Sequence, residues 1–588
     1  MVRRPLLSQH RWRSRGRCDH IRNFPDPLMM EAGTALAPHP SGEVSAAKFS
    51  VRNSGALVAI VLVGIALRCW QYLGDDSYFM DEIAILRNLV EKPWRALLTQ
   101  PLAYGQTAPP GFLAIEKLLF VTLGSTEYSL RLFPLLCSIA SVVVFAKLVC
   151  DLLPKAAALA ALAMFATAGP VILYGAQLKQ YSSDILLACL LLESATRYVS
   201  TRRRRAAYIF GITGAVAVWL SQPAVIVTGS LGFLLLADEV LRARSGAAKS
   251  DLSLLPALVM VGISAACATA YSIHSLTSET RDYLHEYWKN GFLPMHLPTS
   301  LSGLWPYAQL HAFYGVRWGV GIMAYPHSGV FTILTAIGLV ALVIVRKIPG
   351  ALVAAPVFFT LIASAAQQYP FADRTILFLL PSFIIALVVS VEALASAVGQ
   401  RWRAGANILL SGLVGFAAYP VLRHLPPYHL EHLRLAIEYV ASHREPGDAL
   451  YVYHGAVPTF SYYGPLYGFD GPTTILGGCH DDSRQYFREI DQLRGSKRAW
   501  IIIGHPLSVW NERDNMLRYL GAIGLLKSTF SLPSRTWGQE GIFFPVEVEE
   551  YDLSDLAKAD HISAVTFPLL APDHVGRYRC GFGPLAIR

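Results

Sequence analysis

The sequence predicts a polytopic, all-α membrane domain followed by a small α/β domain, and three observations support this prediction. The chain has 588 residues, of which 53% are hydrophobic and only 15% are charged, whereas ordinary soluble domains are roughly 25% charged. Apolar runs close to the roughly 20 residues needed to cross a bilayer recur from position 56 to 422. From position 430 onward, short apolar strands alternate with amphipathic helices instead.

The chain divides into three regions, namely residues 1–54, 55–424 and 425–588. The first region is basic and polar and has no segment apolar enough to cross a membrane, so we expect it to be cytoplasmic and disordered. Basic clusters such as "RYVSTRRRR" (197–205) and "QRWRAG" (400–405) separate the apolar runs. The net charge of +9 is therefore interpreted as a determinant of membrane orientation, and we expect no nucleic-acid partner.

The apolar runs predict eleven membrane spans. These are residues 56–73, 127–149, 156–175, 183–200, 206–221, 224–240, 253–273, 328–345, 350–367, 375–395 and 406–422. A cytoplasmic N-terminus then places the basic clusters inside and the C-terminal domain outside a plasma (inner) membrane. The outer loops would hold most of the unusual polar residues: Asp81, Glu82, Gln177, Lys179, Asp373 and Arg374.

The region after residue 430 has the pattern of a small open sheet covered by helices. We expect strands at 449–454 and 499–504, and helices over 430–445, 481–495 and 511–524. No glycine-rich phosphate loop follows either strand, so nucleotide binding is unsupported. His505 directly follows a strand and is a candidate site residue, although histidines are common in loops. Cys479 and Cys580 could form a disulfide if this region is extracytoplasmic.

Two short helices are expected in the first outer loop. Asp81 precedes Ile83, Leu86 and Val90, which form an apolar stripe typical of a helix lying in the membrane interface. A second short helix follows Pro109-Pro110. Asp81 has two interpretations at this stage, because a carboxylate at this position can cap the helix, with Glu82 in the first turn, or can serve a catalytic site.

Four segments in the expected order resemble a known enzyme superfamily. They are "MDE" (80–82), "PPGFLAIEKLLFVTLG" (109–124) with "EYSLRLFPLLCSIASVVVFAKL" (127–148), "ILYGAQLKQYSSDILLACLLL" (172–192) and "FADRTILFLLPSFIIAL" (371–387). This order resembles the GT-C membrane glycosyltransferases. The resemblance is greatest to the bacterial branch of protein mannosyltransferases, aminoarabinose transferases and lipopolysaccharide-core galacturonosyltransferases (glycosyltransferase families 39 and 83).

The chain also departs from the pattern of that branch. Gln177 stands where the family often has Glu, Lys179 where it has Arg, and Thr375 where it has Tyr. Thr107-Ala108 replaces the Glu-Lys pair that precedes the second flat helix in aminoarabinose transferases. The resemblance therefore does not extend to lipid A aminoarabinose transfer as the specific reaction.

The resemblance implies a sugar transfer from a polyprenyl-phosphate carrier to an extracytoplasmic lipid, glycan or protein acceptor, with inversion at the anomeric carbon. An acceptor hydroxyl needs a base, and Asp81 matches the first-loop aspartate of the family, with Glu82 supporting it or binding a metal. A phosphate leaving group needs positive charge, which Lys179 and Arg374 offer. The alternative for both cations is an interaction with lipid headgroups. Gln177 and Tyr181 are the expected substrate-binding residues.

Several alternatives remain open at this stage. No metal is expected to be essential, although a divalent ion near the paired carboxylates is an alternative that the resemblance allows. The aromatic loop 275–327 either covers the substrates or forms an interfacial belt. A flippase or transporter of lipid-linked substrates is the alternative function, but the predicted spans are nearly free of charge at mid-depth. A membrane scaffold that presents the C-terminal domain is the third hypothesis.

Overall fold

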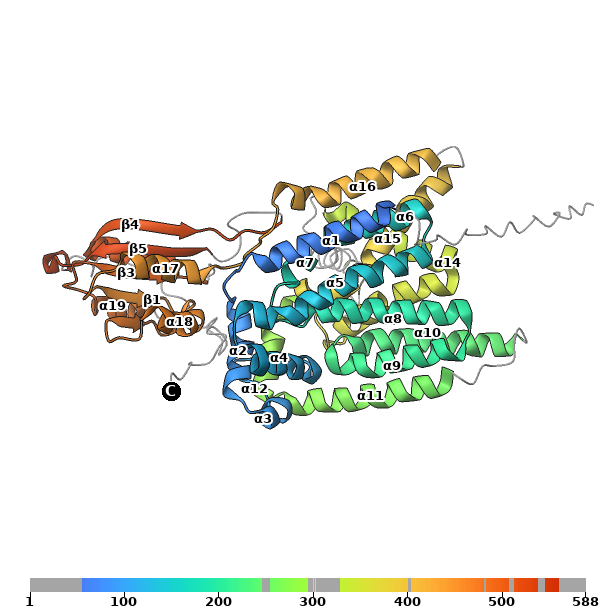
Figure 1. Cartoon of the computed structure of the whole chain (residues 1–588), viewed down its shortest axis with the longest axis horizontal. Helices are drawn as coiled ribbons and strands as arrows, with labels where there is room; N and C mark the ends of the chain where they lie inside the picture. Colours follow the sequence, from blue (N-terminus) through green and yellow to red (C-terminus); the bar gives the residue numbers. More distant parts are fainter. Residues whose placement is uncertain are drawn as a thin grey trace, which may run out of the picture. The chain divides into compact units, whose positions relative to one another are not determined.

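A computed structural model describes residues 55–245, 254–293, 328–399, 403–480, 483–506, 512–537 and 545–559, together with Ser300 and Ser302. The expected cytoplasmic segment 1–54 lies outside these residues. The long helices of the membrane domain run side by side, as α8, α9 and α11 do in Figure 1. They are α1 (Gly55–Leu73), α5 (Glu127–Leu152), α8 (Tyr181–Thr201), α9 (Arg204–Leu220), α10 (Ala224–Arg244), α11 (Leu254–Ser275), α14 (Ser328–Ala365), α15 (Leu380–Val398) and α16 (Arg403–Arg423).

Seven of the described helical segments are long and apolar enough to cross a membrane. They confirm a polytopic helical membrane protein, and they leave the count of eleven spans as a prediction. One of the seven, α14, covers two of the expected spans. Its helical geometry breaks at Lys347, whose φ is 51°, and Pro349 lies two residues later. The remaining expected spans correspond to α8, to the 17-residue α9 and to the pair α6 (Lys155–Ala166) and α7 (Gly169–Tyr174).

Short helices lie between the long ones and carry the residues of interest. They are α2 (Met80–Glu91), α3 (Trp94–Thr99), α4 (Pro110–Leu123), α12 (Ser278–Tyr287) and the 3₁₀ helices η2 (Lys289–Gly291) and η5 (Asp373–Leu379). The two helices expected in the first outer loop are thus present as α2 and α4. Helix α4 begins with Pro110, whose missing N–H costs nothing in the first turn of a helix.

The apolar stripe of α2 packs against protein. Ile83 and Leu86 are buried, as is Leu89, whereas the expected stripe residue Val90 is 53% exposed. The buried side of α2 belongs to the same hydrophobic cluster as residues of the C-terminal domain, including Phe460 of α18 (Val457–Tyr463). The amphipathic pattern of α2 is therefore explained by this packing, and the expectation that its stripe faces the membrane interface is not supported.

The C-terminal domain contains a mixed five-stranded sheet in the order β2-β1-β3-β5-β4. Strand β1 (Ala449–Val452) pairs in parallel with β2 (Thr474–Leu476) and β3 (Ala499–Ile503), and β5 (Val546–Asp552) pairs antiparallel with β3 and β4 (Leu525–Leu532). The predicted strands at 449–454 and 499–504 correspond to β1 and β3. The domain's other elements are α17 (Leu433–His443), α18, α19 (Ser483–Asp491), α20 (Glu512–Ile523) and the 3₁₀ helices η7 (Gly464–Tyr467) and η9 (Leu556–Ala559).

Side chains that alternate between the two faces of the central strands form two separate hydrophobic clusters. Trp500 and Ile502 of β3 belong to the cluster that includes α17 and α18, whereas Ile501 and Ile503 belong to the cluster that includes α19 and α20. Successive side chains of a strand point to opposite faces, so both faces of β3 are covered by helices. Every residue of β3 is buried, as expected for a central strand of a covered sheet.

The C-terminal domain is joined to the first loop by buried and partly buried polar contacts. Arg434 of α17 forms ion pairs of 2.8 Å with Asp75 and with Glu127, the first residue of α5. The Tyr463 hydroxyl donates to Glu127 and accepts a hydrogen bond of 2.8 Å from the Tyr78 N–H. These contacts hold the start of α2 against the C-terminal domain.

Candidate active site

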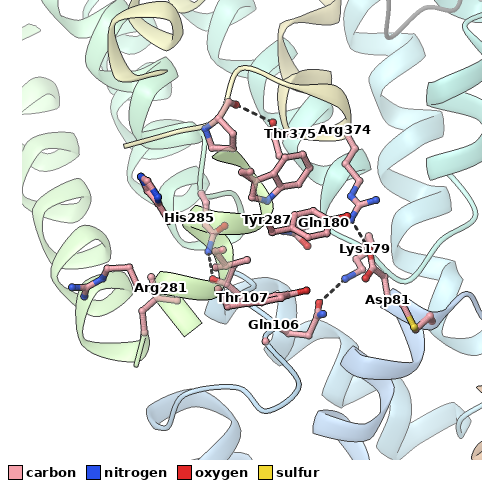
Figure 2. A pocket seen from close by; sticks show the side chains of 18 of the residues that line it. Asp81, Gln106, Thr107, Lys179, Gln180, Arg281, His285, Tyr287, Arg374 and Thr375 are labelled. Atoms are coloured by element: carbon pink, nitrogen blue, oxygen red, sulfur yellow. Dashed lines mark hydrogen bonds and ion pairs between the residues drawn. The ribbon is translucent and has the colours of Figure 1, made fainter. Parts of the chain in front are cut away.

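A cavity of about 1640 Å³ brings together residues from distant parts of the chain. Its lining comes from the start of α2, the loop 105–107, residues 179–181, helices α9 to α12, the segment 366–375 and three loops of the C-terminal domain. Figure 2 shows Asp81, Lys179 and Arg374 converging in one part of the cavity, with Arg281 and His285 of α12 in another. The cavity therefore unites the three residues that the sequence singled out for catalysis and phosphate binding.

Asp81 is the second residue of α2, and Phe79 is the N-cap. The Phe79 N–H donates to Glu82 Oε2 at 2.9 Å, so Glu82 satisfies the backbone group that the helix leaves open at its start. The interpretation of Asp81 as the N-cap is therefore wrong, because the cap lies two residues earlier. The Asp81 side chain lines the cavity instead.

Arg374 is the nearest charged partner of Asp81, with Nη2 2.8 Å from Oδ2. Both side chains are about one-fifth exposed, at 19% for Arg374 and 21% for Asp81. Burial by itself would raise the pKa of Asp81, but the positive charges of Lys179 and Arg374 outweigh burial and hold the pKa below the usual carboxyl value. The carboxylate is thus kept ionised by the two cations beside it.

Lys179 lies in the short segment between α7 and α8 and is 6% exposed. Its Nζ donates to Gln106 Oε1 at 2.8 Å. Burial, together with the nearby charge of Arg374, lowers the pKa of Lys179 below the usual lysine value. A buried ammonium group held by a neutral amide can exchange that amide for an anionic oxygen, which is a stronger hydrogen-bond acceptor.

Glu82 is buried and does not line the cavity. Arg131 of α5 binds it in a two-pronged ion pair, with nitrogen–oxygen distances of 3.0 and 2.8 Å. Its Oε1 also accepts the Leu178 N–H at 2.6 Å. Glu82 therefore links α2, α5 and the segment that carries Lys179, and direct participation in catalysis is not supported by its position.

The two expected substrate-binding residues are placed differently. Tyr181, the first residue of α8, lines the cavity, as does the neighbouring Gln180. Gln177 is 6% exposed and is not among the lining residues. Because the chain turns tightly here, with the Lys179 N–H donating to the Gln177 carbonyl at 2.7 Å, Gln177 faces a different environment from Lys179.

Some lining residues were not singled out from the sequence. Gln106 holds Lys179, and the Arg374 guanidinium lies 5.7 Å from the Trp288 ring centroid in a cation–π contact. Trp288, Tyr283 and Tyr287, which belong to the aromatic loop 275–327, also line the cavity. Residues 294–299, 301 and 303–327 of this loop lie outside the described part. The candidate His505 also lines the cavity.

The residues around Asp81 do not fit a divalent metal. The Glu82 oxygens are occupied by Arg131 and by backbone N–H groups, and Asp81 is paired with Arg374. A hard cation needs several free oxygen ligands. Within the residues that the structure describes, no group of three or more His, Cys, Asp or Glu side chains is arranged to hold a metal ion.

Comparison with known protein families agrees with the resemblance inferred from the sequence. Residues 107–267 match the family model of dolichyl-phosphate-mannose-protein mannosyltransferase. The matched segment contains Lys179 and three of the stretches that carried the resemblance, at 109–124, 127–148 and 172–192. Within this segment, which is about a quarter of the chain, the protein is similar to a family of mannosyltransferases. No curated protein sequence matches it.

Solved structures of three glycosyltransferases are similar to this one. For ArnT from Cupriavidus metallidurans bound to undecaprenyl phosphate, the TM-score is 0.42 at 11% identity, over 84% of this chain and 98% of that one. For the Archaeoglobus fulgidus oligosaccharyltransferase, the TM-score is 0.41 at 11% identity, and the match covers 76% of this chain and 67% of that one. For the mycobacterial arabinofuranosyltransferase AftD, the TM-score is 0.34 at 14% identity, and the match covers 84% of this chain and 41% of that one.

Proposed function

We propose that this protein is a GT-C membrane glycosyltransferase that moves a sugar from a polyprenyl-phosphate carrier to an extracytoplasmic lipid, glycan or protein acceptor, with inversion at the anomeric carbon. The single observation that carries the proposal is the contact between Asp81 and Arg374, with Lys179 beside it, in one cavity. This arrangement unites a carboxylate with two cations, as the transfer from a phosphate carrier requires. The matched mannosyltransferase family supports the class of donor.

The carrier phosphate is proposed to bind to Lys179 and Arg374. Arg374 is the second residue of η5, at the start of the candidate span Asp373–Ala397, and a phosphate at the membrane surface could reach it there. Guanidinium and ammonium groups stabilise the charge that develops on the departing phosphate, so no proton donor is needed at the leaving oxygen. Tyr181 lines the same part of the cavity and is proposed to contact the donor.

Asp81 is proposed to act as the base. When the carrier phosphate takes over Arg374, the Asp81 carboxylate becomes available to the acceptor. A bond then forms between the acceptor oxygen or nitrogen and the anomeric carbon, and the bond from that carbon to the phosphate oxygen breaks. The bonding electrons leave with the phosphate, and the acceptor proton passes to Asp81. A single displacement of this kind inverts the anomeric centre.

Glu82 and Gln177 are proposed to act on the site indirectly. The Glu82–Arg131 pair and the bond from the Leu178 N–H hold α2 against the segment that carries Lys179. Gln177 accepts the Lys179 N–H through its backbone carbonyl and so shapes the same turn. These contacts set the separation between the proposed base and one of the proposed phosphate ligands.

The proposal places the cavity and the C-terminal domain on the outer side of a plasma (inner) membrane crossed by eleven spans. The basic clusters between the apolar runs support this orientation. Cys479, which lines the cavity, is disulfide-bonded, and disulfides persist in oxidising compartments. Its expected partner Cys580 lies outside the described residues.

The proposal is tested by supplying membranes that contain the protein with a panel of radiolabelled undecaprenyl-phosphate sugars. We expect the label to move from the carrier to an acceptor, and Asp81→Asn to stop this movement. Label that crosses the bilayer while still attached to its carrier would instead support the transporter hypothesis. Modification of a cysteine placed at position 81 by an impermeant reagent from the cytoplasmic side alone would contradict the proposed orientation.

A further inference from the structure

The C-terminal domain contributes one wall of the cavity, and this wall comes from the ends of the three parallel strands. The segments 454–458 and 476–479 and the residue His505 follow or end β1, β2 and β3, and all three line the cavity. We call these residues the strand-end wall. In open α/β sheets, ligands bind at the carboxyl ends of parallel strands, because the loops there converge.

Two histidines of the strand-end wall are each backed by a buried carboxylate. His454 Nε2 lies 3.2 Å from Glu512 Oε2, and His505 Nδ1 lies 3.5 Å from Glu431 Oε2. The carboxylate side chains are 0% and 2% exposed, whereas both histidine side chains are 10% exposed. The hydrogen bond between His454 Nε2 and Glu512 Oε2 fixes the orientation of that imidazole, and the Glu431 carboxylate lies close to the His505 ring.

The backbone around these histidines is unusually constrained. His505 has a φ of 51°, in the left-handed region that a residue with a side chain enters at a cost, and such strain concentrates at functional sites. A Cβ at Gly455 would lie 2.7 Å from the His505 carbonyl oxygen. The loops after β1 and β3 therefore approach closely only because residue 455 is glycine.

The strand-end wall has a different charge character from the opposite side of the cavity. Its residues among those described include no Lys, Arg, Asp or Glu, whereas Lys179 and Arg374 lie on the membrane-domain side. Asp81 interacts electrostatically with Lys179 and Arg374 and also with His505. Asp81 thus lies between a cationic region suited to phosphate and the strand-end wall, which carries two imidazoles.

A wall that carries imidazoles and no Lys, Arg, Asp or Glu suits a ligand with many hydroxyl groups. An imidazole offers both a donor and an acceptor, and sugar hydroxyls need both. A peptide that pairs with a sheet would need the free edge of an outer strand. Strand β2 is an outer strand, but it reaches the cavity through its last residue, Leu476, and so presents an end.

We propose that the strand-end wall is the acceptor subsite, that it binds a saccharide, and that His454 and His505 hold the saccharide so that its nucleophilic hydroxyl faces Asp81. This inference rests on the proposed function and deepens it by naming the acceptor class and the residues that select it. His454 and His505 are substrate-binding residues in this proposal, and the proton still passes to Asp81.

The test uses the purified full-length chain in nanodiscs and two acceptor preparations from the producing cells, a glycolipid extract and a delipidated protein extract. Radiolabelled undecaprenyl-phosphate sugars serve as donors, and undecaprenyl phosphate alone is the probe for the donor region, read as a shift in the thermal unfolding temperature. We expect label to enter the glycolipid extract. His454→Ala and His505→Ala should each reduce this transfer at least tenfold, through a higher KM for the glycolipid, with the undecaprenyl-phosphate shift unchanged.

His443→Ala is the matched control, because His443 is an exposed histidine of the same domain that does not line the cavity, and it should transfer at the wild-type rate. His454→Gln and His505→Gln should show the same defect, and they replace the alanine variants if those do not fold. Transfer to the protein extract alone, wild-type kinetics in both histidine variants, or loss of the undecaprenyl-phosphate shift in them would overturn the inference while leaving the proposed function standing. Absence of transfer by the wild type to either extract would overturn the proposed function itself.

Discussion

Arg374 Nη2 lies 2.8 Å from Asp81 Oδ2, although 293 positions separate the two residues in the chain. The contact joins the start of α2 to η5, and both side chains line the cavity that also contains Lys179. In the proposed reaction this ion pair must open, because the carrier phosphate competes with Asp81 for Arg374. The pair therefore couples binding of the donor to release of the base.

Removal of either proposed phosphate ligand should weaken carrier binding. Lys179→Ala and Arg374→Ala each remove a charge-assisted hydrogen bond of about 1.5–3 kcal/mol, so the Kd for undecaprenyl phosphate should rise about 10- to 150-fold. The measurement is a binding titration in nanodiscs. Arg87→Ala is the control, because Arg87 pairs with Glu91 on α2 and does not line the cavity. Unchanged affinity in both cavity variants would refute the proposed phosphate site.

The pH dependence of transfer should have an alkaline limb set by Lys179. The ammonium group must be protonated to bind phosphate, and burial lowers its pKa, so activity should fall at a lower pH than the ordinary lysine pKa of about 10.4 would give. Lys179→Arg should move that limb to higher pH, since arginine stays protonated. Transfer rates at subsaturating donor across a pH series measure the limb. An identical alkaline limb in the wild type and Lys179→Arg would exclude Lys179 as its source.

The acid limb should reflect Asp81. The neighbouring cations hold its pKa below the usual carboxyl value of about 3.9, so Asp81 remains ionised, and activity is retained, until the pH falls below that value. Removing one cation by Lys179→Gln should raise the pKa of Asp81 and shift the acid limb of kcat toward neutral pH. A shift of that limb in the opposite direction would contradict the assignment.

Glu82→Gln should chiefly destabilise the fold. The substitution leaves Arg131, which is 4% exposed, without its charged partner, and breaking one side of a buried ion pair costs about 3–5 kcal/mol. Thermal unfolding in detergent provides the measurement, with Glu91→Gln as the control at an exposed ion pair of the same helix. A Glu82→Gln protein that unfolds at the wild-type temperature but lacks transfer activity would instead indicate a catalytic role for Glu82.

Local patterns in the sequence were sufficient to predict much of the fold. The start of α4 at Pro110, the buried strand β3 and the helical character of α2 follow from turn residues and hydrophobic periodicity. The side of α2 that is buried was not predictable, because Leu89 rather than Val90 packs against a domain more than 300 residues later in the chain.

Site residues that lie in a recognisable local motif could be predicted from the sequence. Site residues whose role depends on tertiary packing could not. Asp81, Lys179 and Arg374 were identified from their motifs, and the structure brings them together. Glu82 appeared equivalent to Asp81 in the sequence, but its ion pair with Arg131 spans 49 positions and no local pattern reveals it. The same holds for His454, the last residue of the predicted strand 449–454, because no local pattern shows that three strand ends meet beside it.

Asp81 is the proposed base of the transfer reaction, and the Asp81→Asn substitution tests this role directly. The asparagine side chain keeps the shape of the carboxylate but cannot take the acceptor proton, so transfer of label from a radiolabelled undecaprenyl-phosphate sugar should fall about 10²- to 10⁴-fold. The thermal shift caused by undecaprenyl phosphate should persist, and Asp282→Asn, at an exposed aspartate of α12, should transfer normally. Wild-type transfer by a folded, carrier-binding Asp81→Asn protein would contradict the central claim.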